Sequence, residues 1–250
     1  MQRIKSLSEY FKKYESSEKD PEKFWSQIAD SFIWKKKWDN VLESNFENAD
    51  FKWFKNAQLN ITENIFERNL SERGDKTAII WEPNDPKESP IYLSYKELYE
   101  QTCTFSNALR SKGIKKGDRV IIYMPMVPEA AIAMLACARV GAVHSVVFAG
   151  FSAASLADRI NDCEAKMVLT SDGNFRGNKT IPVKDVVDEA LEKCSSIESV
   201  IVLERTKQNI NMENGRDFWW HECIEDEPNT CDSEVMDSED LLFILYTSGS

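Results

Sequence analysis

The chain has 250 residues, of which 42% are hydrophobic and 29% charged, as is ordinary for a soluble globular protein, and its net charge is −11. The charge is uneven: residues 204–250 carry 3 basic and 12 acidic side chains, which argues against a general surface for nucleic acid or an anionic membrane. No apolar run typical of a signal peptide follows the start, and the longest apolar stretch, Ala130 to Ala138, is too short to span a bilayer. We therefore expect a cytoplasmic protein without a nucleic-acid or membrane partner.

The six cysteines form no Cys-x-x-Cys pair, and several fall in helical patterns. This indicates reduced core thiols and not a disulfide framework or a zinc site. The two histidines, His144 and His221, are interpreted as structural. The sequence therefore contains few residues that could form a metal centre or a histidine-based triad.

Residues 1–70 are rich in aromatic side chains and are predicted to be helical. One helix is predicted to begin at Pro21, because Asp20 is a good N-cap and proline suits the first helical position. No excess of basic residues accompanies the aromatic ones. We therefore expect them to dock this segment on a larger body and not to stack on nucleic-acid bases.

From residue 77 onward the pattern predicts an α/β fold. A hairpin of strands 77–81 and 91–94 precedes a helix over 95–112, which Gly113 ends. Short apolar strands then alternate with helices, which predicts βαβ units and a parallel sheet covered on both faces. The predicted strands are 119–124, 143–148, 166–170, 199–203 and 241–246, and the predicted helices are 128–140, 152–163 and 183–194.

Ligands of parallel sheets bind beyond the carboxyl ends of the strands, so the loops at 148–151, 171–182 and 247–250 are candidate binding segments. In the first loop, small residues allow a ligand to approach closely, and Ser152 can cap the helix that follows. The alternative interpretation of this loop is a tight connection between a strand and a helix.

The second loop places Arg176 and Lys179 three residues apart among Gly and Asn residues, so the two cations can converge on phosphate groups. A solvated polar loop is the alternative, and the spacing matches neither a Walker loop nor a GxGxxG fingerprint. The third loop follows an apolar run, 241–245, that is predicted to be a buried strand. Its sequence, Thr247-Ser248-Gly249-Ser250, is typical of the start of a phosphate-binding loop or of a plain turn.

Taken together, these segments resemble the AMP-forming acetyl-CoA synthetases, within the adenylate-forming ligase superfamily. Gly117-Asp118-Arg119-Val120 begins a match to the first Rossmann-like unit of that family, and the most specific strings are 141–152, 215–220 and 242–250. The resemblance covers essentially the whole chain. It implies an N-terminal segment over 1–65 and, over 66–250, the first part of an AMP-binding domain with a Rossmann-like parallel sheet, truncated at the C-terminus.

The resemblance also implies a two-step acetate–CoA ligase. Acetate and MgATP would give enzyme-bound acetyl-adenylate and pyrophosphate, and the CoA thiol would then displace AMP. Adenylation gives the carboxylate a stable phosphate leaving group, while Mg²⁺ and loop donors stabilise the charge that builds up on the phosphates. The acetate pocket and the C-terminal domain would lie beyond residue 250, so we expect the 250-residue chain alone to be inactive.

The resemblance assigns binding roles to two sets of positions. The ATP phosphate loop would open with Thr247, Ser248, Gly249 and Ser250. The CoA-binding positions would be Arg176, Gly177, Asn178 and Lys179, whose cations would meet CoA phosphates, together with Phe148, Ala149 and Gly150 near the CoA adenine. The family often has glycine where Asn178 and Ala149 stand. No catalytic or metal-binding residue is assigned.

Two alternatives stay open at this point. The first is a ligase for another short acid such as propionate, because the residues that would separate it from acetate fall outside 1–250. The second is a truncated, non-catalytic module that binds a nucleotide or CoA. Against this second reading, an apolar strand left at an exposed sheet edge would favour aggregation.

Overall fold

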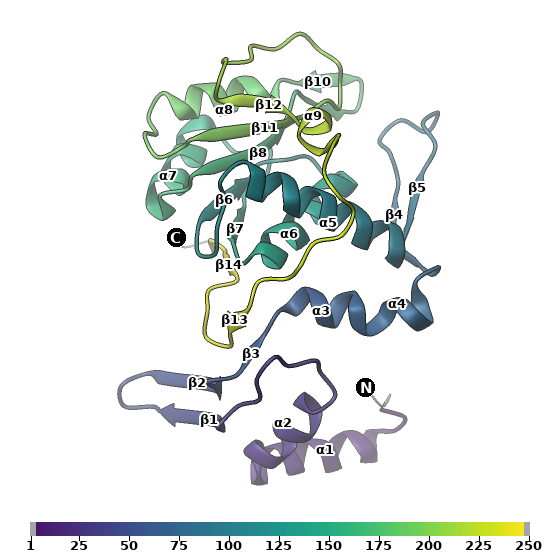
Figure 1. The fold of residues 1–250 in the computed structure, drawn as a ribbon, viewed down its shortest axis with the longest axis vertical. Coiled ribbons are helices and arrows are strands. Elements are labelled where there is room, and N and C mark those ends of the chain that lie inside the picture. The colour runs from purple at the N-terminus through teal and green to yellow at the C-terminus, as the bar shows by residue number, and fades with distance from the viewer. Residues whose placement is uncertain (1–3, 248–250) are drawn as a thin grey trace. The chain divides into compact units, whose positions relative to one another are not determined.

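The computed structural model describes residues 4–247 (Figure 1). They form two compact units: a smaller one that runs to Arg68 and includes Val235–Asp240, and a larger one made of Asn69–Glu234 with the segment from Leu241 on. The division into residues 1–65 and 66–250 stays a prediction, since the compact units also assign Val235–Asp240 to the first part.

The smaller unit starts with two helices, α1 (Leu7–Lys19) and α2 (Pro21–Ala29). A side chain caps each helix: Ser6 Oγ accepts a hydrogen bond from the Glu9 N–H at 3.2 Å, and Asp20 Oδ1 accepts one from the Lys23 N–H at 3.1 Å. The predicted start of a helix at Asp20 and Pro21 is therefore confirmed.

Residues 40–55 differ from the helical prediction, because they form an antiparallel hairpin of β1 (Asn40–Asn45) and β2 (Asp50–Lys55). Pairs such as Leu42 with Trp53 give large side chains a partner across the hairpin, a contact that helical spacing does not reveal. The unit also contains β3 (Gln58–Leu59), its partner β13 (Met236–Asp237) and α3 (Ile61–Ile65), and the boundary with the larger unit falls within α4 (Glu67–Arg73).

The larger unit is built on a six-stranded parallel sheet with the order β12-β11-β8-β6-β7-β14, which confirms the predicted α/β fold. The predicted hairpin is confirmed as β4 (Thr77–Trp81) and β5 (Ile91–Ser94). The sheet strands are β6 (Arg119–Ile122), β7 (Val143–Val146), β8 (Met167–Ser171), β11 (Ser199–Leu203), β12 (Asp217–Trp219) and β14 (Phe243–Ile244). The helices are α5 (Tyr95–Ser111), α6 (Pro128–Val140), α7 (Ala153–Cys163), α8 (Val183–Leu191) and α9 (Trp220–Ile224).

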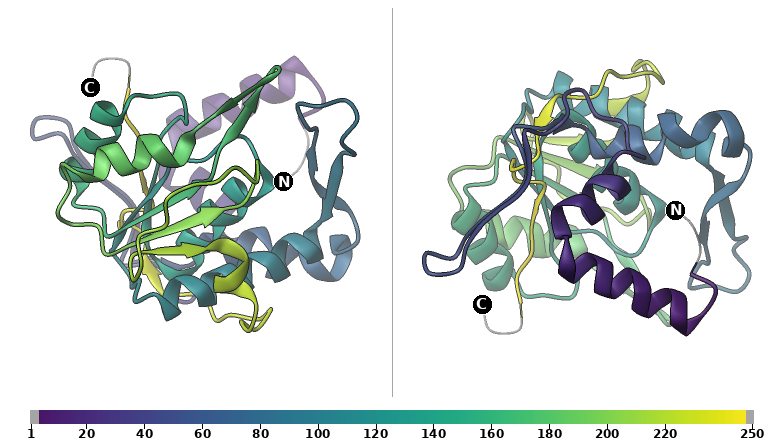
Figure 2. Two further views of the ribbon diagram at one scale, coloured as in Figure 1. Left: turned by 90° about the horizontal axis from the view of Figure 1, so that it is seen from above. Right: turned by 90° about the horizontal axis from the view of Figure 1, so that it is seen from below.

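Alternate residues of the central strands face two different helix layers. Ile121, Val168 and Val200 belong to one buried cluster with residues of α7 and α8. On the other face, Phe105 of α5 stacks on Trp220 of α9 with the ring centroids 3.6 Å apart. Figure 2 shows the two helix layers on opposite faces of the sheet. Burial on both faces explains why these strands are continuous apolar runs.

Glycines end two of the predicted helices. Gly113 and Gly141 follow α5 and α6 with φ of +86° and +73°, a left-handed conformation that costs glycine little. Both predicted helix ends are therefore confirmed. Among the helices in residues 4–247, none is both long and apolar enough to cross a bilayer.

The last strand differs from its prediction. The apolar run 241–245 predicts a buried strand, but β14 contains Phe243 and Ile244 alone and lies at the edge of the sheet. Leu241, Phe243 and Leu245 are 67%, 48% and 64% exposed. The prediction of burial is wrong here because, within the described part of the chain, β7 is the single strand beside β14.

Candidate functional site

The loop at 171–182 contains a short antiparallel hairpin of β9 (Asn174–Arg176) and β10 (Lys179–Ile181). Gly177 takes the first of the two turn positions with φ of +57°, where a side chain would add strain. The sequence places Arg176 and Lys179 in an irregular loop. The structure pairs them directly across the hairpin.

This pairing puts the two cations on one face of the hairpin. Residues opposite each other in an antiparallel pair share a face, and both Arg176 and Lys179 are exposed. Like charges at opposed positions repel each other, and an anion bound between them would relieve the repulsion. The geometry therefore suits a phosphate or another multiply charged anion.

The opposite face of the hairpin carries Phe175 and packs on neighbouring elements. The Arg205 guanidinium carbon lies 5.0 Å from the centre of the Phe175 ring. At the turn, the Asn84 side-chain amide donates to the Gly177 carbonyl at 3.3 Å. A pocket of about 640 Å³ lies between the hairpin and the turn after β4, lined by Asn84, Asp85, Pro86, Lys87, Glu88, Phe175, Gly177, Asn178 and Thr180.

A buried carboxylate anchors the base of the hairpin. Asp172 is fully buried, and its Oδ1 accepts hydrogen bonds from the backbone N–H groups of Gly173, Arg205 and Thr206 at 2.6, 2.8 and 2.9 Å. The Gln208 side-chain amide donates to the Asp172 carbonyl at 2.6 Å. The segments that follow β8 and β11 are thereby tied together at the base of the hairpin.

The loop after β7 presents an exposed aromatic ring. Phe148 is 68% exposed, whereas the neighbouring Ala149 is 9% exposed. A Cβ on Gly150 would lie 2.5 Å from the Phe148 ring, so a larger residue there would displace the ring. The Tyr123 hydroxyl donates to the Phe151 carbonyl at 2.7 Å and fixes the end of the loop. The predicted cap at Ser152 is confirmed, since its Oγ accepts from the Ser155 N–H.

Arg159 of α7 joins this loop to the chain after β14. Its guanidinium carbon lies 4.9 Å from the centre of the Phe151 ring and 4.8 Å from that of Tyr246. The Tyr246 hydroxyl donates to Asp162, and burial together with this hydrogen bond raises the pKa of Tyr246. Thr247 follows and is exposed, while Ser248, Gly249 and Ser250 lie outside the described residues.

Through Arg159, the structure thus joins the loop after β7 to Tyr246, the residue that directly precedes the candidate loop 247–250. The loop at 171–182, which forms the β9–β10 hairpin, contacts the turn between β4 and β5 and Arg205 instead. The roles in CoA and ATP binding stay predictions for all three loops.

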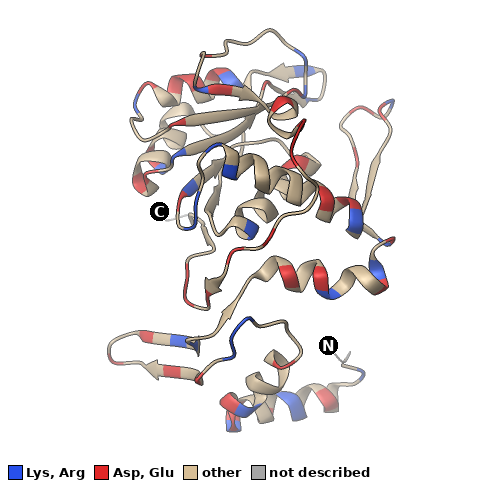
Figure 3. Cartoon of the chain, in the orientation of Figure 1, with Lys and Arg blue, Asp and Glu red and all other residues tan. Residues whose placement is uncertain are grey.

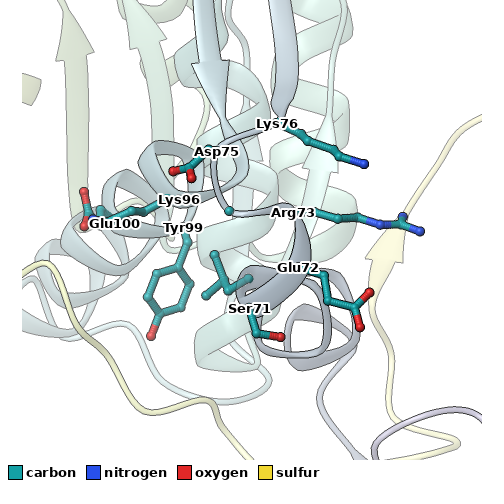
Figure 4. A pocket seen from close by; sticks show the side chains of 10 residues that line it. Ser71, Glu72, Arg73, Asp75, Lys76, Lys96, Tyr99 and Glu100 are labelled. Carbon is teal, nitrogen blue, oxygen red and sulfur yellow. The ribbon is translucent and has the colours of Figure 1, made fainter.

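A second pocket, of about 530 Å³, lies between α4 and the start of α5 and contains charges of both signs (Figure 4). Arg73 and Lys76 extend away from Tyr99, and Asp75 and Glu100 add negative charge. The pocket therefore does not gather cations as a phosphate site does.

Acidic residues follow α9, at Glu225, Asp226, Glu227, Asp232 and Glu234. Figure 3 colours acidic positions of the chain red. Within residues 4–247 they form no cluster of three or more His, Cys, Asp or Glu side chains that could hold a metal ion. Of the cysteines, Cys137 is fully buried, and burial raises the pKa of its thiol to about 12.

Comparisons with known proteins define the class. Residues 66–250 match the family of AMP-binding enzymes, and residues 10–65 match the acetyl-coenzyme A synthetase N-terminus. The chain belongs to the AMP-binding enzyme family. It corresponds, more specifically, to the N-terminal region of acetyl-coenzyme A synthetases.

Individual relatives support this assignment. The acetyl-coenzyme A synthetase of Syntrophobacter fumaroxidans is 52% identical over 96% of this chain and 37% of its own length. That of Halorhodospira halophila is 49% identical over 98% of this chain and 38% of its own length. Among solved structures, acetoacetyl-CoA synthetase from Streptomyces lividans superposes with a TM-score of 0.83 and 26% identity over 92% of this chain and 35% of that one. The chain spans about 37% of the length of its curated relatives.

Sequence reasoning missed Arg205 and the residues around Asn84. Arg205 follows β11, so the rule that ligands bind beyond strand ends also points to it. Asn84 belongs to a turn outside the parallel sheet, and no motif in the sequence connects it to the hairpin.

Proposed function

We propose that this chain provides the CoA-phosphate contacts and the opening of the ATP phosphate loop in an acetate–CoA ligase. The ligase converts acetate and MgATP into acetyl-adenylate and pyrophosphate, and the CoA thiol then displaces AMP. Its substrates are acetate, ATP and CoA, and it works in the cytoplasm.

The observation that carries this proposal is the pairing of Arg176 with Lys179 at the tip of an exposed hairpin. CoA carries phosphate groups, and a guanidinium fork beside an ammonium group binds phosphate oxygens well. The exposed Phe148 ring, for which the absence of a side chain at Gly150 leaves room, offers an apolar surface on which the CoA adenine stacks. Thr247 to Ser250 supply hydroxyl and backbone donors to the phosphates of ATP.

The proposal is tested by an Arg176→Ala substitution in the full-length ligase. The loss of a hydrogen bond to a charged group costs about 1.5–3 kcal/mol, so KM for CoA should rise roughly 10- to 100-fold. Acetate-dependent exchange between ATP and pyrophosphate, which needs no CoA, should stay near normal. Steady-state kinetics with CoA and the exchange assay measure the two half-reactions separately.

Arg73→Ala is the matched control, because Arg73 is an exposed arginine of the same unit that lies in the other pocket. It should leave both half-reactions unchanged. Equal damage to both half-reactions by Arg176→Ala would contradict the proposed CoA contact and indicate a folding role. The same assay with propionate in place of acetate identifies the preferred acid, and the 250-residue chain alone should form no acetyl-CoA.

A further inference from the structure

The Arg205 side chain connects two hairpins that lie far apart in the sequence. Its guanidinium contacts the rings of both Phe175 of β9 and Trp81 of β4, with its carbon 5.0 and 5.1 Å from the two ring centres. Its Nη1 and Nη2 donate to the two carboxylate oxygens of Glu88 at 3.0 and 2.9 Å. A planar guanidinium can contact both rings and donate two hydrogen bonds to the carboxylate at the same time, which a lysine ammonium group cannot do.

This contact decides which face of the β9–β10 hairpin turns outward. Successive side chains of a strand point to opposite faces, so Phe175 and Arg176 point in opposite directions. When Phe175 lies against Arg205, Arg176 and its cross-strand partner Lys179 must face away from the cluster. The direction of the two cations is therefore set by a contact on the other side of the hairpin.

The hairpin is held at three levels, and Arg205 contributes to the first two directly and to the third through Glu88. At the base, the Arg205 N–H donates to the buried Asp172 carboxylate at 2.8 Å. In the middle, the Arg205 side chain packs on Phe175. At the tip, Asn84 reaches the Gly177 carbonyl, and this turn is itself joined to Arg205 through Glu88. The β4–β5 turn thus acts as a brace whose attachment point is the Arg205 side chain.

We propose that Arg205 is a positioning residue for the CoA loop: it holds the β9–β10 hairpin so that Arg176 and Lys179 face the CoA phosphates, without touching CoA itself. This inference rests on the proposed function. A hairpin of two three-residue strands is short, so its docked orientation depends on the side chains that hold it. If the hairpin leaves its docked position, the apparent affinity for CoA falls in proportion to the docked fraction that remains.

The test compares Arg205→Gln, Glu88→Gln and the double variant in the full-length ligase. Each single substitution should raise KM for CoA by about three- to tenfold, because the hairpin then leaves its docked position in a larger fraction of the molecules. The value of kcat and the exchange between ATP and pyrophosphate should not change. Because the two residues act as one unit, the double variant should be no worse than the more damaging single one. Hydrogen exchange of the amides in 174–181 should quicken in the same variants.

Arg205→Lys keeps the charge and should recover part of the CoA affinity. Glu43→Gln is the control, because it removes another partly exposed ion pair, with Lys55 at 2.8 Å, in the smaller unit. It should not change KM for CoA. A purely structural role for Arg205 would slow both half-reactions together and would overturn the inference.

Arg176→Ala distinguishes a failure of the positioning role from a failure of the proposed function. If Arg176→Ala raises KM for CoA but Arg205→Gln leaves it and the hairpin exchange unchanged, the positioning role is refuted and the proposed function stands. If Arg176→Ala itself leaves KM for CoA unchanged, the proposed function and the inference built on it both fail.

Discussion

His144 lies on β7 with 9% of its surface exposed, and within the described residues its Nδ1 has no hydrogen-bond partner. Burial lowers the pKa of this imidazole from 6.5 to about 4. The unfolded chain therefore binds more protons between these two values, so the free energy of unfolding should fall as the pH drops through this window. The shift corresponds to about 3 kcal/mol of stability that is fully present above pH 6.5 and lost near pH 4.

Denaturant unfolding at pH 7 and pH 4.5, with and without His144→Gln, measures this contribution. The variant should lose less stability than the original chain between the two pH values. His221→Gln is the matched control, because His221 is exposed. If both variants keep the full pH dependence of the original chain, other groups are responsible for it.

At the scale of elements, a buried ion pair fixes α8 to β12. Lys184 of α8 and Asp217 of β12 are joined at 2.8 Å, with both side chains fully buried. Burial alone would raise the pKa of Asp217, but hydrogen bonds from Arg216 and Lys184 outweigh it and lower that pKa. Lys184→Met leaves the Asp217 charge without one of its buried partners, and should cost about 3–5 kcal/mol in the free energy of unfolding.

The double variant Lys184→Met with Asp217→Leu tests whether the lost pairing causes this cost. Replacing both partners by apolar residues should be less damaging than the sum of the two single substitutions, in denaturant unfolding of all four proteins. Additive costs would show that the two side chains contribute independently.

The elements that could be predicted from the sequence are those whose pattern is local. The order of the strands and helices predicted from residue 77 to 203 is confirmed because each of them carries its own periodicity, and α5, α6 and α7 also have a side-chain cap or a terminal glycine. Strands β9 and β10 have three residues each, too few for a pattern to show. The contact between Arg205 and Glu88 joins residues 117 positions apart, which no local rule detects.

The candidate site, too, could be predicted from the sequence only in part. The cations Arg176 and Lys179 were found from their residue type and spacing, because a phosphate site needs such groups after a strand. Their shared face follows from the pairing across the hairpin, and the direction of that face depends on the packing of Phe175 against the distant Arg205. The β1–β2 hairpin was missed for a related reason, since aromatic residues suit both helices and strands in a short segment.

In the molecule as a whole, the sheet of the larger unit ends on one side at β14, and four apolar side chains in and next to this strand are exposed. These are Leu241, Leu242, Phe243 and Leu245, with 67%, 39%, 48% and 64% of their surface exposed. An edge strand with apolar side chains is a template for pairing with another chain. We therefore expect the 250-residue chain, when purified by itself, to associate with further copies of itself through this edge.

Sedimentation velocity over a range of protein concentrations measures this association. Leu245→Lys should shift the chain toward the monomer, because a charge directly after the edge strand opposes pairing and the residue contributes little to the core. Met126→Lys adds the same charge at another exposed apolar position, 87% exposed and in the loop after β6, and should leave the association unchanged. Equal effects of the two substitutions would mean that net charge governs the association. A chain that stays monomeric at all concentrations would show that this edge is protected in solution.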